Sequence, residues 1–290
     1  MDKKGFYHLF SDGFRTSSLF EDNQAFISGM NIVGICSLKC DITILAFILM
    51  DNHVHFILHG SFKACTSFKE KFVHQYALWY SHRYSGKKYE TIEFDTKLME
   101  DEKYILNSIT YVLKNSISAG YIYCSEDYPW SSAGLYFRMT EQLNSITSGW
   151  RSVSEMSVRE RRSAFKTQAD IPGEWKISPK GYIWPGNYIG YRMVEQLFRS
   201  PRSFTYFMGY SKEDEVGVHR NVALPDTEVR EKAVGICHEL YRKTNLRSLS
   251  VAERMTVGRR LRKEYGCPVK QIARIIHVDP LYLKEGLAHH

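Results

Sequence analysis

The strongest structural signal in the chain is the stretch Ile44-Leu-Ala-Phe-Ile-Leu-Met-Asp-Asn-His-Val-His-Phe-Ile-Leu-His59. It consists of two apolar runs, 44–50 and 53–59, on either side of Asp51-Asn52. Asp and Asn favour tight turns, so the pattern predicts an antiparallel β-hairpin. Because side chains alternate along a strand, the second run places His53 and His55 on one face and turns Val54 toward the core.

The segments around this hairpin predict an α+β domain over residues 1–140. The aromatic run 6–10 predicts a strand. Segments 22–34, 67–84 and 102–118 have the apolar spacing of helices, and Ala119-Gly120 is typical of a helix end. We therefore expect an antiparallel sheet covered by helices.

The bulk properties indicate a folded protein with more than one domain. The chain has 290 residues, of which 43% are hydrophobic and 24% are charged. Its longest apolar run, 42–50, is far shorter than the roughly 20 residues of a membrane helix. The N-terminus lacks the apolar core of a secretory signal, and the cysteines form no CxxC pair. We expect a cytoplasmic protein with no membrane partner.

The C-terminal part of the chain is basic. Residues 236–290 contain 11 Lys and Arg against 5 Asp and Glu, out of a net charge of +7 for the whole chain. A capping box, Ser250 with Glu253, opens the first of three predicted short helices, and the next two cover 269–276 and the residues after Pro280. The pattern predicts a helical domain over 236–290 with helix-turn-helix character. Residues 141–235 are interpreted as a linker and accessory region without a legible role.

Two groups of side chains in residues 1–140 are candidates for chemistry. His53 and His55 share a strand face and suit one divalent metal ion, although most such pairs are surface residues. On the helix 102–118, Tyr111 and Asn115 stand one turn apart, on a different side from the apolar stripe Ile105, Ile109 and Val112. Taken alone, a Tyr/Asn pair at this spacing is expected by chance in a chain with 19 tyrosines, and a solvated polar face is its simpler explanation.

Four motifs in this domain resemble those of one enzyme family. Met50-Asp-Asn-His-Val-His55 resembles the Met-Pro-Asn-His-Val-His segment of HUH transposases, in particular the REP-associated tyrosine transposase group. The segment Tyr111-Val-Leu-Lys-Asn-Ser-Ile-Ser-Ala-Gly120 is similar to that group's Tyr-Ile-His-x-Asn-Pro-Val-x-Ala-Gly helix. The domain's opening (11–13 and 19–20) and its closing segment Glu126-Asp-Tyr-Pro-Trp-Ser-Ser132 are also similar. The motifs occur in the expected order.

The resemblance implies a ferredoxin-like HUH domain that cuts single-stranded DNA at sites with hairpins. It implies that His53 and His55 bind Mg²⁺ or Mn²⁺, with Asn115 as the third ligand, and that Tyr111 attacks a DNA phosphate to form a 5′-phosphotyrosine. A divalent ion offsets the charge that develops on a scissile phosphate. A phenol, with a reference pKa near 10, is a suitable nucleophile and leaving group. The family also implies a bacterial protein acting at the nucleoid.

Two positions depart from the family's pattern. Asp51 stands where the family usually has proline, which puts the geometry of the turn in doubt and adds a carboxylate near the proposed metal. Ser116 replaces the proline after the helix asparagine and allows the helix to continue, because proline inside a helix costs about 3 kcal/mol. Neither change removes a proposed catalytic group.

Several cations are candidates for DNA contacts. One set accompanies the aromatic residues of segment 67–88, although core packing explains those aromatics equally well: Lys69, Lys71, Arg83 and Lys87. The other lies in the C-terminal unit and suits contacts to the DNA backbone, with a solvated helix as the alternative: Arg259, Arg260, Arg262 and Lys263.

Three questions stay open at the level of sequence. The chain could be a non-catalytic, domesticated transposase that binds hairpin DNA or RNA and regulates, although no proposed ligand has been lost. A relaxase or replication initiator is a further alternative; such proteins often carry further catalytic tyrosines or helicase domains, and this chain has neither a phosphate-binding glycine loop nor room for a helicase. The sequence also leaves open whether Tyr111 serves its own histidine pair or that of a partner in a homodimer.

Overall fold

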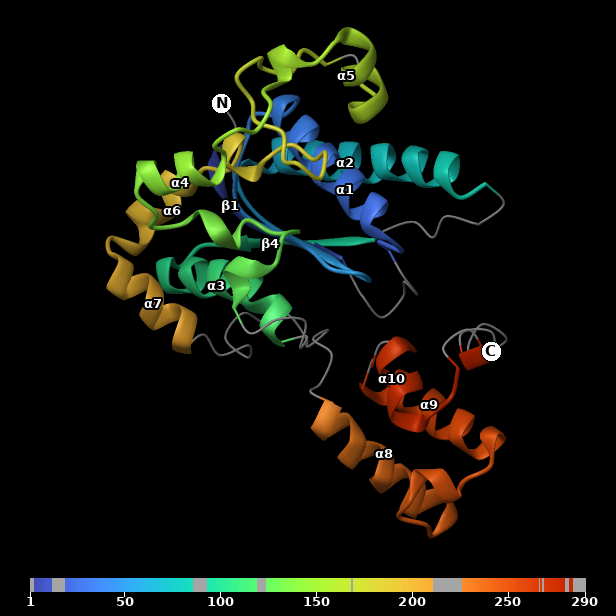
Figure 1. The fold of residues 1–290 in the computed structure, drawn as a ribbon. Helices are drawn as coiled ribbons and strands as arrows, with labels where there is room; N and C mark the ends of the chain where they lie inside the picture. The colour runs from blue at the N-terminus through green and yellow to red at the C-terminus, as the bar shows by residue number, and fades with distance from the viewer. Residues whose placement is uncertain are drawn as a thin grey trace.

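The structure is a computed structural model that describes residues 3–11, 19–85, 93–118, 124–167, 169–210, 226–265, 267, 269–279 and 282–283. Figure 1 shows a central sheet with helices on both sides and a separate group of helices at the C-terminal end. The chain is therefore of the α+β class, as the sequence predicts.

The sheet has four antiparallel strands in the order β2-β3-β1-β4. These are β1 (Lys4–Ser11), β2 (Ile42–Leu49), β3 (Val54–Ser61) and β4 (Phe94–Met99). One helix joins β1 to β2 and another joins β3 to β4, so each of these strand pairs encloses a third strand. This interleaving is the split β-α-β arrangement of ferredoxin-like topology.

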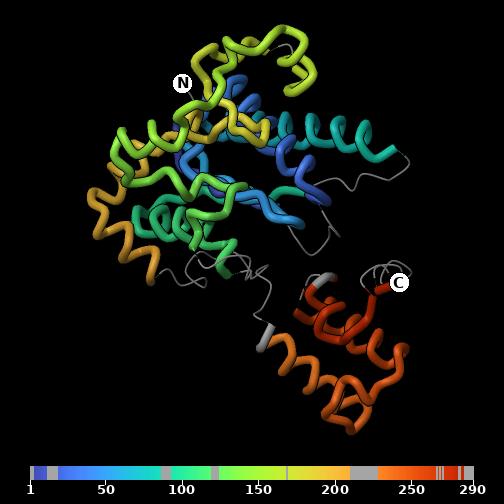
Figure 2. Tube along the Cα trace, in the orientation of Figure 1, coloured from blue at the N-terminus to red at the C-terminus, as the bar shows by residue number. Residues whose placement is uncertain are grey.

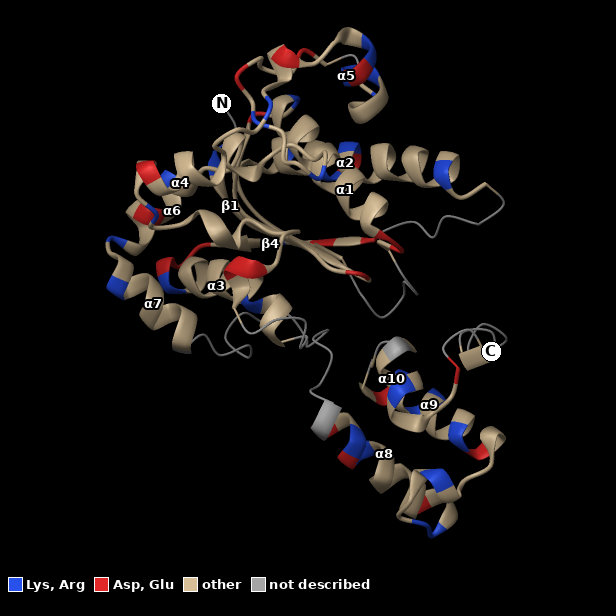
Figure 3. Ribbon diagram, viewed as in Figure 1, with Lys and Arg blue, Asp and Glu red and all other residues tan. Residues whose placement is uncertain are grey.

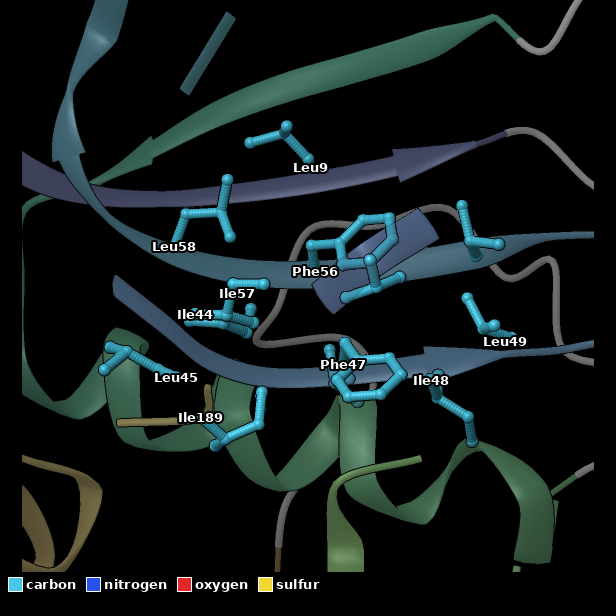
Figure 4. Packing of buried hydrophobic residues seen from close by; sticks show 14 of the residues in the cluster. Leu9, Ile44, Leu45, Phe47, Ile48, Leu49, Phe56, Ile57, Leu58 and Ile189 are labelled. Atoms are coloured by element: carbon cyan, nitrogen blue, oxygen red, sulfur yellow. The ribbon is translucent and has the colours of Figure 1, made fainter. Parts of the chain in front are cut away.

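The two faces of the sheet have different covers. Helices α1 (Asn23–Leu38) and α2 (Phe62–Arg83) pack against each other and on one face, where Phe56 of β3 contacts Phe68 and Phe72 at ring-centroid distances of 5.3 and 5.2 Å. Helix α3 (Glu102–Ser118) covers the other face, where it contacts β2, β3 and β4. Figure 4 shows packed side chains of β1, β2 and β3, among them Phe47 of β2 and Phe56 of β3. The histidines of β3 consequently face α3.

The predicted hairpin is confirmed. Strands β2 and β3 pair antiparallel, with Leu49 opposite Val54, around a turn at Asp51-Asn52. The predicted helix 102–118 has the observed bounds, and α1 and α2 both extend beyond the predicted segments. The end of the third helix at Ala119-Gly120 lies outside the described residues. Strand β4 was not predicted.

Residues after 140 pack against the sheet domain. They form α4 (Thr140–Ile146), α5 (Val158–Phe165), α6 (Tyr191–Phe198) and α7 (Pro201–Tyr210). The Gly190 amide donates to the Ile44 carbonyl at 2.9 Å, and Ile189 packs beside Ile44 and Leu45 (Figure 4). Asn31 of α1 binds the backbone of Gly181 and Ile183. Of the region 141–235, predicted as a linker and accessory region, the part up to residue 210 thus packs on the sheet domain and contributes to its main hydrophobic core.

The C-terminal helices form a second core. They are α8 (Asp226–Tyr241), α9 (Val251–Tyr265) and α10 (Val269–Ile276), coloured orange to red in Figure 2. The predicted boundary at residue 236 falls inside α8, whose Val229 and Ala233 belong to the same core. The capping box is confirmed, since the Ser250 amide donates to Glu253 and the Glu253 amide donates to Ser250.

A helix-turn-helix character for this unit stays a prediction. Of the predicted third helix, only residues 282–283 are described, and they are helical.

Five short 3₁₀ segments complete the described elements: Ser125–Asp127, Ala133–Leu135, Val153–Glu155, Pro185–Asn187 and Leu246–Ser248. Within the described residues, no helix has the length and apolar character needed to cross a membrane.

Candidate active site

The candidate site lies between the sheet and α3. His55 is on β3, His53 immediately precedes β3, and Tyr111 and Asn115 are on α3. The rings of Tyr111 and His55 meet edge to face with centroids 5.5 Å apart, and Asn115 Oδ1 lies 3.0 Å from His53 Nε2. The structure thus brings together, within one chain, the four residues that the sequence predicts for catalysis and metal binding.

The environment of Tyr111 differs from the sequence-based expectation. A solvated polar face was the alternative interpretation for the side of α3 that bears Tyr111 and Asn115, but Tyr111 is only 5% exposed and Asn115 only 1%. The apolar stripe with Ile109 and Val112 is buried as well. Helix α3 packs against the sheet and also against α7, so both of its sides are covered. The polar side is the one that meets the histidines.

The contacts of His53 indicate a place for a cation. Its Nδ1 lies 2.7 Å from Asn52 Oδ1, and its Nε2 lies 3.0 Å from Asn115 Oδ1. A neutral imidazole carries one N–H, so if Nδ1–H donates to Asn52, the Nε2 atom presents a lone pair to the Asn115 amide, which either donates to it through Nδ2–H when turned by 180° or shares a metal ion with it through Oδ1. A second proton would place a charge at a residue that is only 3% exposed. A metal ion between Nε2 and Oδ1 satisfies both acceptors.

His55 has a third histidine as its neighbour. Its Nδ1 lies 3.1 Å from Nε2 of His8, which is on β1, and both side chains are buried. If His55 Nδ1–H donates to His8, the Nε2 atom of His55 keeps its lone pair and can bind a metal ion. That Nε2 atom and the Asn115 amide nitrogen are buried without a hydrogen-bond partner among the described residues. The His53 and His55 ring centroids are 5.0 Å apart, so one ion can contact both.

Burial keeps these imidazoles in the form that binds metals. Desolvation, followed by the charge of Lys97, lowers the pKa of His8 to about 3. Desolvation, followed by the neighbouring His53 and His8, holds the pKa of His55 well below its usual range. Metal ligation requires neutral histidine, so both rings are in the appropriate protonation state at neutral pH.

The residues present fit a small divalent cation. Ligands on adjacent corners of an octahedral Mg²⁺ site, with bonds of about 2.1 Å, lie about 3.0 Å apart, as His53 Nε2 and Asn115 Oδ1 do. The donors are two nitrogens and one amide oxygen, which leaves room for water and phosphate oxygens. No group of three or more His, Cys, Asp and Glu among the described residues is placed to hold a metal ion.

His8 was missed because its sequence signal is weak. The run 6–10 predicts a strand, and alternation places His8 with Phe6 and Phe10 on one face. Its contact with His55 depends on the pairing of β1 with β3, which puts His8 opposite Ile57 and Phe10 opposite His55.

Lys97 was missed too. The unpredicted strand β4 places it opposite His8, with its amine 5.1 Å from the Tyr104 ring centroid.

The predicted DNA-contacting cations of α2 are not at this site. Helix α2 packs on the sheet face opposite to α3, so Lys69, Lys71 and Arg83 are separated from Tyr111 by the sheet. Lys71 donates to Ser67 at 2.6 Å, and Arg83 lies 3.7 Å from Asp22. Lys87 lies outside the described residues.

The predicted cations of the C-terminal unit all lie on α9 (Figure 3). Arg259 and Lys263 are exposed. Arg260 instead forms ion pairs with Glu239 and Glu264, and Arg262 donates to the Cys267 carbonyl.

Comparisons with known proteins give one distant likeness. No protein-family model matches the chain, and no curated protein does. Among solved structures, a REP-associated tyrosine transposase bound to a REP hairpin is similar to this chain. The match covers 44% of this chain and 75% of the transposase chain, with 16% sequence identity and a TM-score of 0.34.

Proposed function

We propose that the chain is a metal-dependent, single-tyrosine HUH endonuclease or transposase that cuts and rejoins single-stranded DNA. The observation that carries this proposal is the convergence of Tyr111 with a metal-ligand set of the same chain. Tyr111 packs on His55, while His53 Nε2 and Asn115 Oδ1 lie 3.0 Å apart. A nucleophile beside a cation site is the arrangement that phosphoryl transfer requires.

His53, His55 and Asn115 would hold Mg²⁺ or Mn²⁺, with ligation through Nε2 of each histidine and Oδ1 of the asparagine. When bound, such an ion stabilises the charge that develops on a nonbridging phosphate oxygen. In that arrangement Asn52 Oδ1 would accept from His53 Nδ1–H, and His8 Nε2 would accept from His55 Nδ1–H, which would hold both rings with Nε2 free for the ion. Lys97 adds positive charge beside His8, at the strand next to it.

Tyr111 would supply the nucleophile. Its phenolic oxygen loses its proton to solvent and attacks phosphorus, and the bond between phosphorus and the 3′ oxygen breaks. The products are a 5′-phosphotyrosine and a free 3′-hydroxyl. Attack by another 3′-hydroxyl on the phosphotyrosine releases the phenol and rejoins the DNA. The energy of the phosphodiester is kept in the covalent intermediate throughout.

Tyr111 would act with its own chain's histidines. The distance from Tyr111 to His55 within one chain supports this, because the site is assembled without a second copy. A mixture of Tyr111→Phe with His55→Ala protein is therefore expected to form no adduct. Recovery of adduct on mixing would instead show that the tyrosine of one subunit serves the histidines of another in a dimer.

The substrate would be single-stranded DNA, with hairpins as the expected recognition feature. The reacting groups lie between α3 and the sheet, and Tyr111 is nearly buried. A single flexible backbone can approach such a site more closely than a rigid duplex. In the C-terminal unit, the exposed Arg259 and Lys263 of α9 are suited to phosphate contacts.

The test is formation of a covalent protein–DNA adduct. Labelled single-stranded hairpin DNA is incubated with Mn²⁺ and wild-type protein or Tyr111→Phe, and adducts are detected after denaturation. We expect an adduct with the wild type only, and none in the presence of EDTA. Tight hairpin binding with no adduct across varied sequences and metals would favour the rival function, a non-catalytic hairpin-binding regulator.

A further inference from the structure

Two adjoining cavities lie outside the candidate active site, where α5 meets α1 and α2. The first has a volume of about 540 Å³ and is lined by α1, by α2 with Leu78, Trp79 and Arg83, and by the end of α5. The second has a volume of about 380 Å³ and is lined by α5 and the segment that follows it, with Arg161 and Arg162. Phe165 lines both. We call the two together the α2–α5 groove.

The lining of this groove is basic, and among the described residues Arg83 is the lining cation that has a carboxylate partner, Asp22. Its described lining contains arginines, Lys166 and His82 but no aspartate or glutamate. Among the described residues, Arg161, Arg162 and Lys166 take part in no ion pair, whereas Arg151 beside the same helix pairs with Glu160. Guanidinium groups that the protein leaves without carboxylates, at the wall of a cavity, favour an anionic ligand.

Arg161 gives a second, independent indication. Its Nε atom is buried and has no hydrogen-bond partner among the described residues. A buried donor without a partner costs about 1–3 kcal/mol. An anion in the second cavity would bind the guanidinium group of Arg161 and offset part of that cost.

The first cavity adds flat apolar surface to this charge. Leu78 is 59% exposed although it is a large hydrophobic residue, and Trp79 and Phe165 also line the cavity. Bases of single-stranded nucleic acid stack on such surfaces, while their phosphates bind neighbouring cations. A groove with guanidinium groups in one hollow and aromatic surface in the next matches the alternation of phosphate and base in one strand. A free phosphate would not use the apolar hollow.

We propose that the α2–α5 groove binds a single-stranded segment of nucleic acid, with phosphates at Arg161 and Arg162 and an unpaired base against Leu78 and Trp79. This proposal rests on the proposed function only in taking the nucleic acid to be DNA. The groove lies on the α1–α2 side of the sheet, opposite to Tyr111. It thus holds a part of the strand away from the phosphate that is cut, and it gives the segment after residue 140 a role in binding.

The proposal is tested by binding of fluorescent oligothymidine of 20 nucleotides, measured by anisotropy in EDTA, with Tyr111→Phe as the parent protein. We expect Arg161→Gln/Arg162→Gln to weaken binding by about tenfold. Loss of two phosphate contacts should also reduce the slope of log K against log salt by about 1.4. Arg159→Gln removes an exposed charge of the same helix that does not line the groove, and it should leave both quantities nearly unchanged.

Two further variants separate charge from folding and base from backbone. Arg161→Lys/Arg162→Lys keeps both charges and should keep the slope of log K against log salt. If the arginines had only a structural role, the affinity of this variant for oligothymidine would fall as far as that of the double glutamine variant. Leu78→Ala should weaken oligothymidine binding severalfold but leave binding of a blunt 20-base-pair duplex unchanged. Equal losses of affinity for oligothymidine and for the duplex in Leu78→Ala would contradict the proposed base contact. Equal affinities and salt slopes for Arg161→Gln/Arg162→Gln and Arg159→Gln would contradict nucleic-acid binding in the groove.

The outcome is independent of the catalytic proposal. If wild-type protein forms the Tyr111 adduct while oligothymidine binding does not depend on Arg161 and Arg162, the proposal for the α2–α5 groove is wrong and the proposed catalytic function stands. If binding depends on the two arginines but no adduct forms with any DNA, the groove stands and the catalytic proposal fails.

Discussion

Single residues decide the chemistry at the candidate site, and Asn115 is the most informative of them. Its Oδ1 faces His53 Nε2 at 3.0 Å, although the amide nitrogen of Asn115 has no partner among the described residues. With this orientation Asn115 offers an oxygen beside His53 Nε2, as the proposed metal site requires, whereas a turned amide would donate to Nε2 instead. Asn115 is therefore the residue at which the proposed metal site is tested most sharply.

Removal of the third ligand should weaken the metal site. We expect Asn115→Ala to lower Mn²⁺ affinity by about 10- to 100-fold, the usual cost of losing a ligand or its supporting partner. Asn115→Asp keeps an oxygen in place and adds charge, so its affinity should equal or exceed that of the wild type. Isothermal titration calorimetry with Mn²⁺ measures both. Unchanged affinity in Asn115→Ala would exclude the amide from the ligand set.

His8 should act as a positioning residue through His55. We expect His8→Leu to weaken Mn²⁺ binding by about tenfold or more, because His55 Nδ1–H loses its acceptor and the ring can turn its own N–H toward the ion. His8→Gln offers an amide oxygen as an acceptor and should restore most of the affinity. Equal losses in the two variants would mean that His8 contributes only to packing. Calorimetric titration with Mn²⁺ distinguishes these results.

At the scale of elements, the close approach of α1 to the sheet determines how the domain packs. A Cβ atom at Gly29 of α1 would lie 2.5 Å from Cε1 of Phe20 and 3.0 Å from Cδ1 of Leu49. Alanine normally stabilises a helix interior relative to glycine by about 1 kcal/mol. Here the overpacking, at about 1–3 kcal/mol, opposes and exceeds that gain.

Two glycine substitutions should therefore have opposite signs. We expect Gly29→Ala to lower the free energy of unfolding of the sheet domain by about 1–2 kcal/mol. Gly235→Ala in α8 should raise that of the C-terminal unit by up to about 1 kcal/mol, since a Cβ atom there meets nothing within 4 Å. Urea unfolding followed by circular dichroism measures both changes. Stabilisation by Gly29→Ala would contradict the close packing of α1 on Phe20 and Leu49.

The sequence predicted elements well where periodicity is strong and failed where packing decides. The hairpin and α3 carry clear patterns, and the structure has both. Strand β4, Phe94-Asp-Thr-Lys-Leu-Met99, mixes charged and apolar residues because it is an edge strand, so its pattern is weak. Burial of the polar side of α3 was unpredictable, since it depends on buried histidines that reach α3 from two other strands. The pairing of His8 with His55 depends on a strand register that spans 47 residues.

At the scale of the whole molecule, the described residues form two principal cores. Residues up to 210 share the core around the sheet, with a smaller cluster beneath α5, and residues 226–283 form a core of their own. No periodic pattern in 141–210 indicates that this segment packs on the sheet, because its contacts come from scattered side chains such as Ile189 and Val194 and from backbone groups such as that of Gly190. Separate cores of this kind unfold as separate cooperative units.

The two cores should be visible in calorimetry. We expect differential scanning calorimetry of the full chain to show two unfolding transitions, and a chain that ends at Tyr210 to keep only one of them. The shortened protein should still form the Tyr111 adduct, because the site lies entirely within the first core. A single transition in the full chain, or unfolding of the shortened protein, would show that the two units depend on each other.

The most direct test of the central claim is to identify the amino acid that carries the DNA. After reaction with hairpin DNA and Mn²⁺, the adduct is digested with nuclease and trypsin and analysed by tandem mass spectrometry. The tryptic peptide 104–114 contains both Tyr104 and Tyr111, which gives an internal control two turns away on the same helix. The proposed mechanism predicts a 5′-linked nucleotide on Tyr111 alone. A nucleotide on Tyr104 or on any other residue would contradict it.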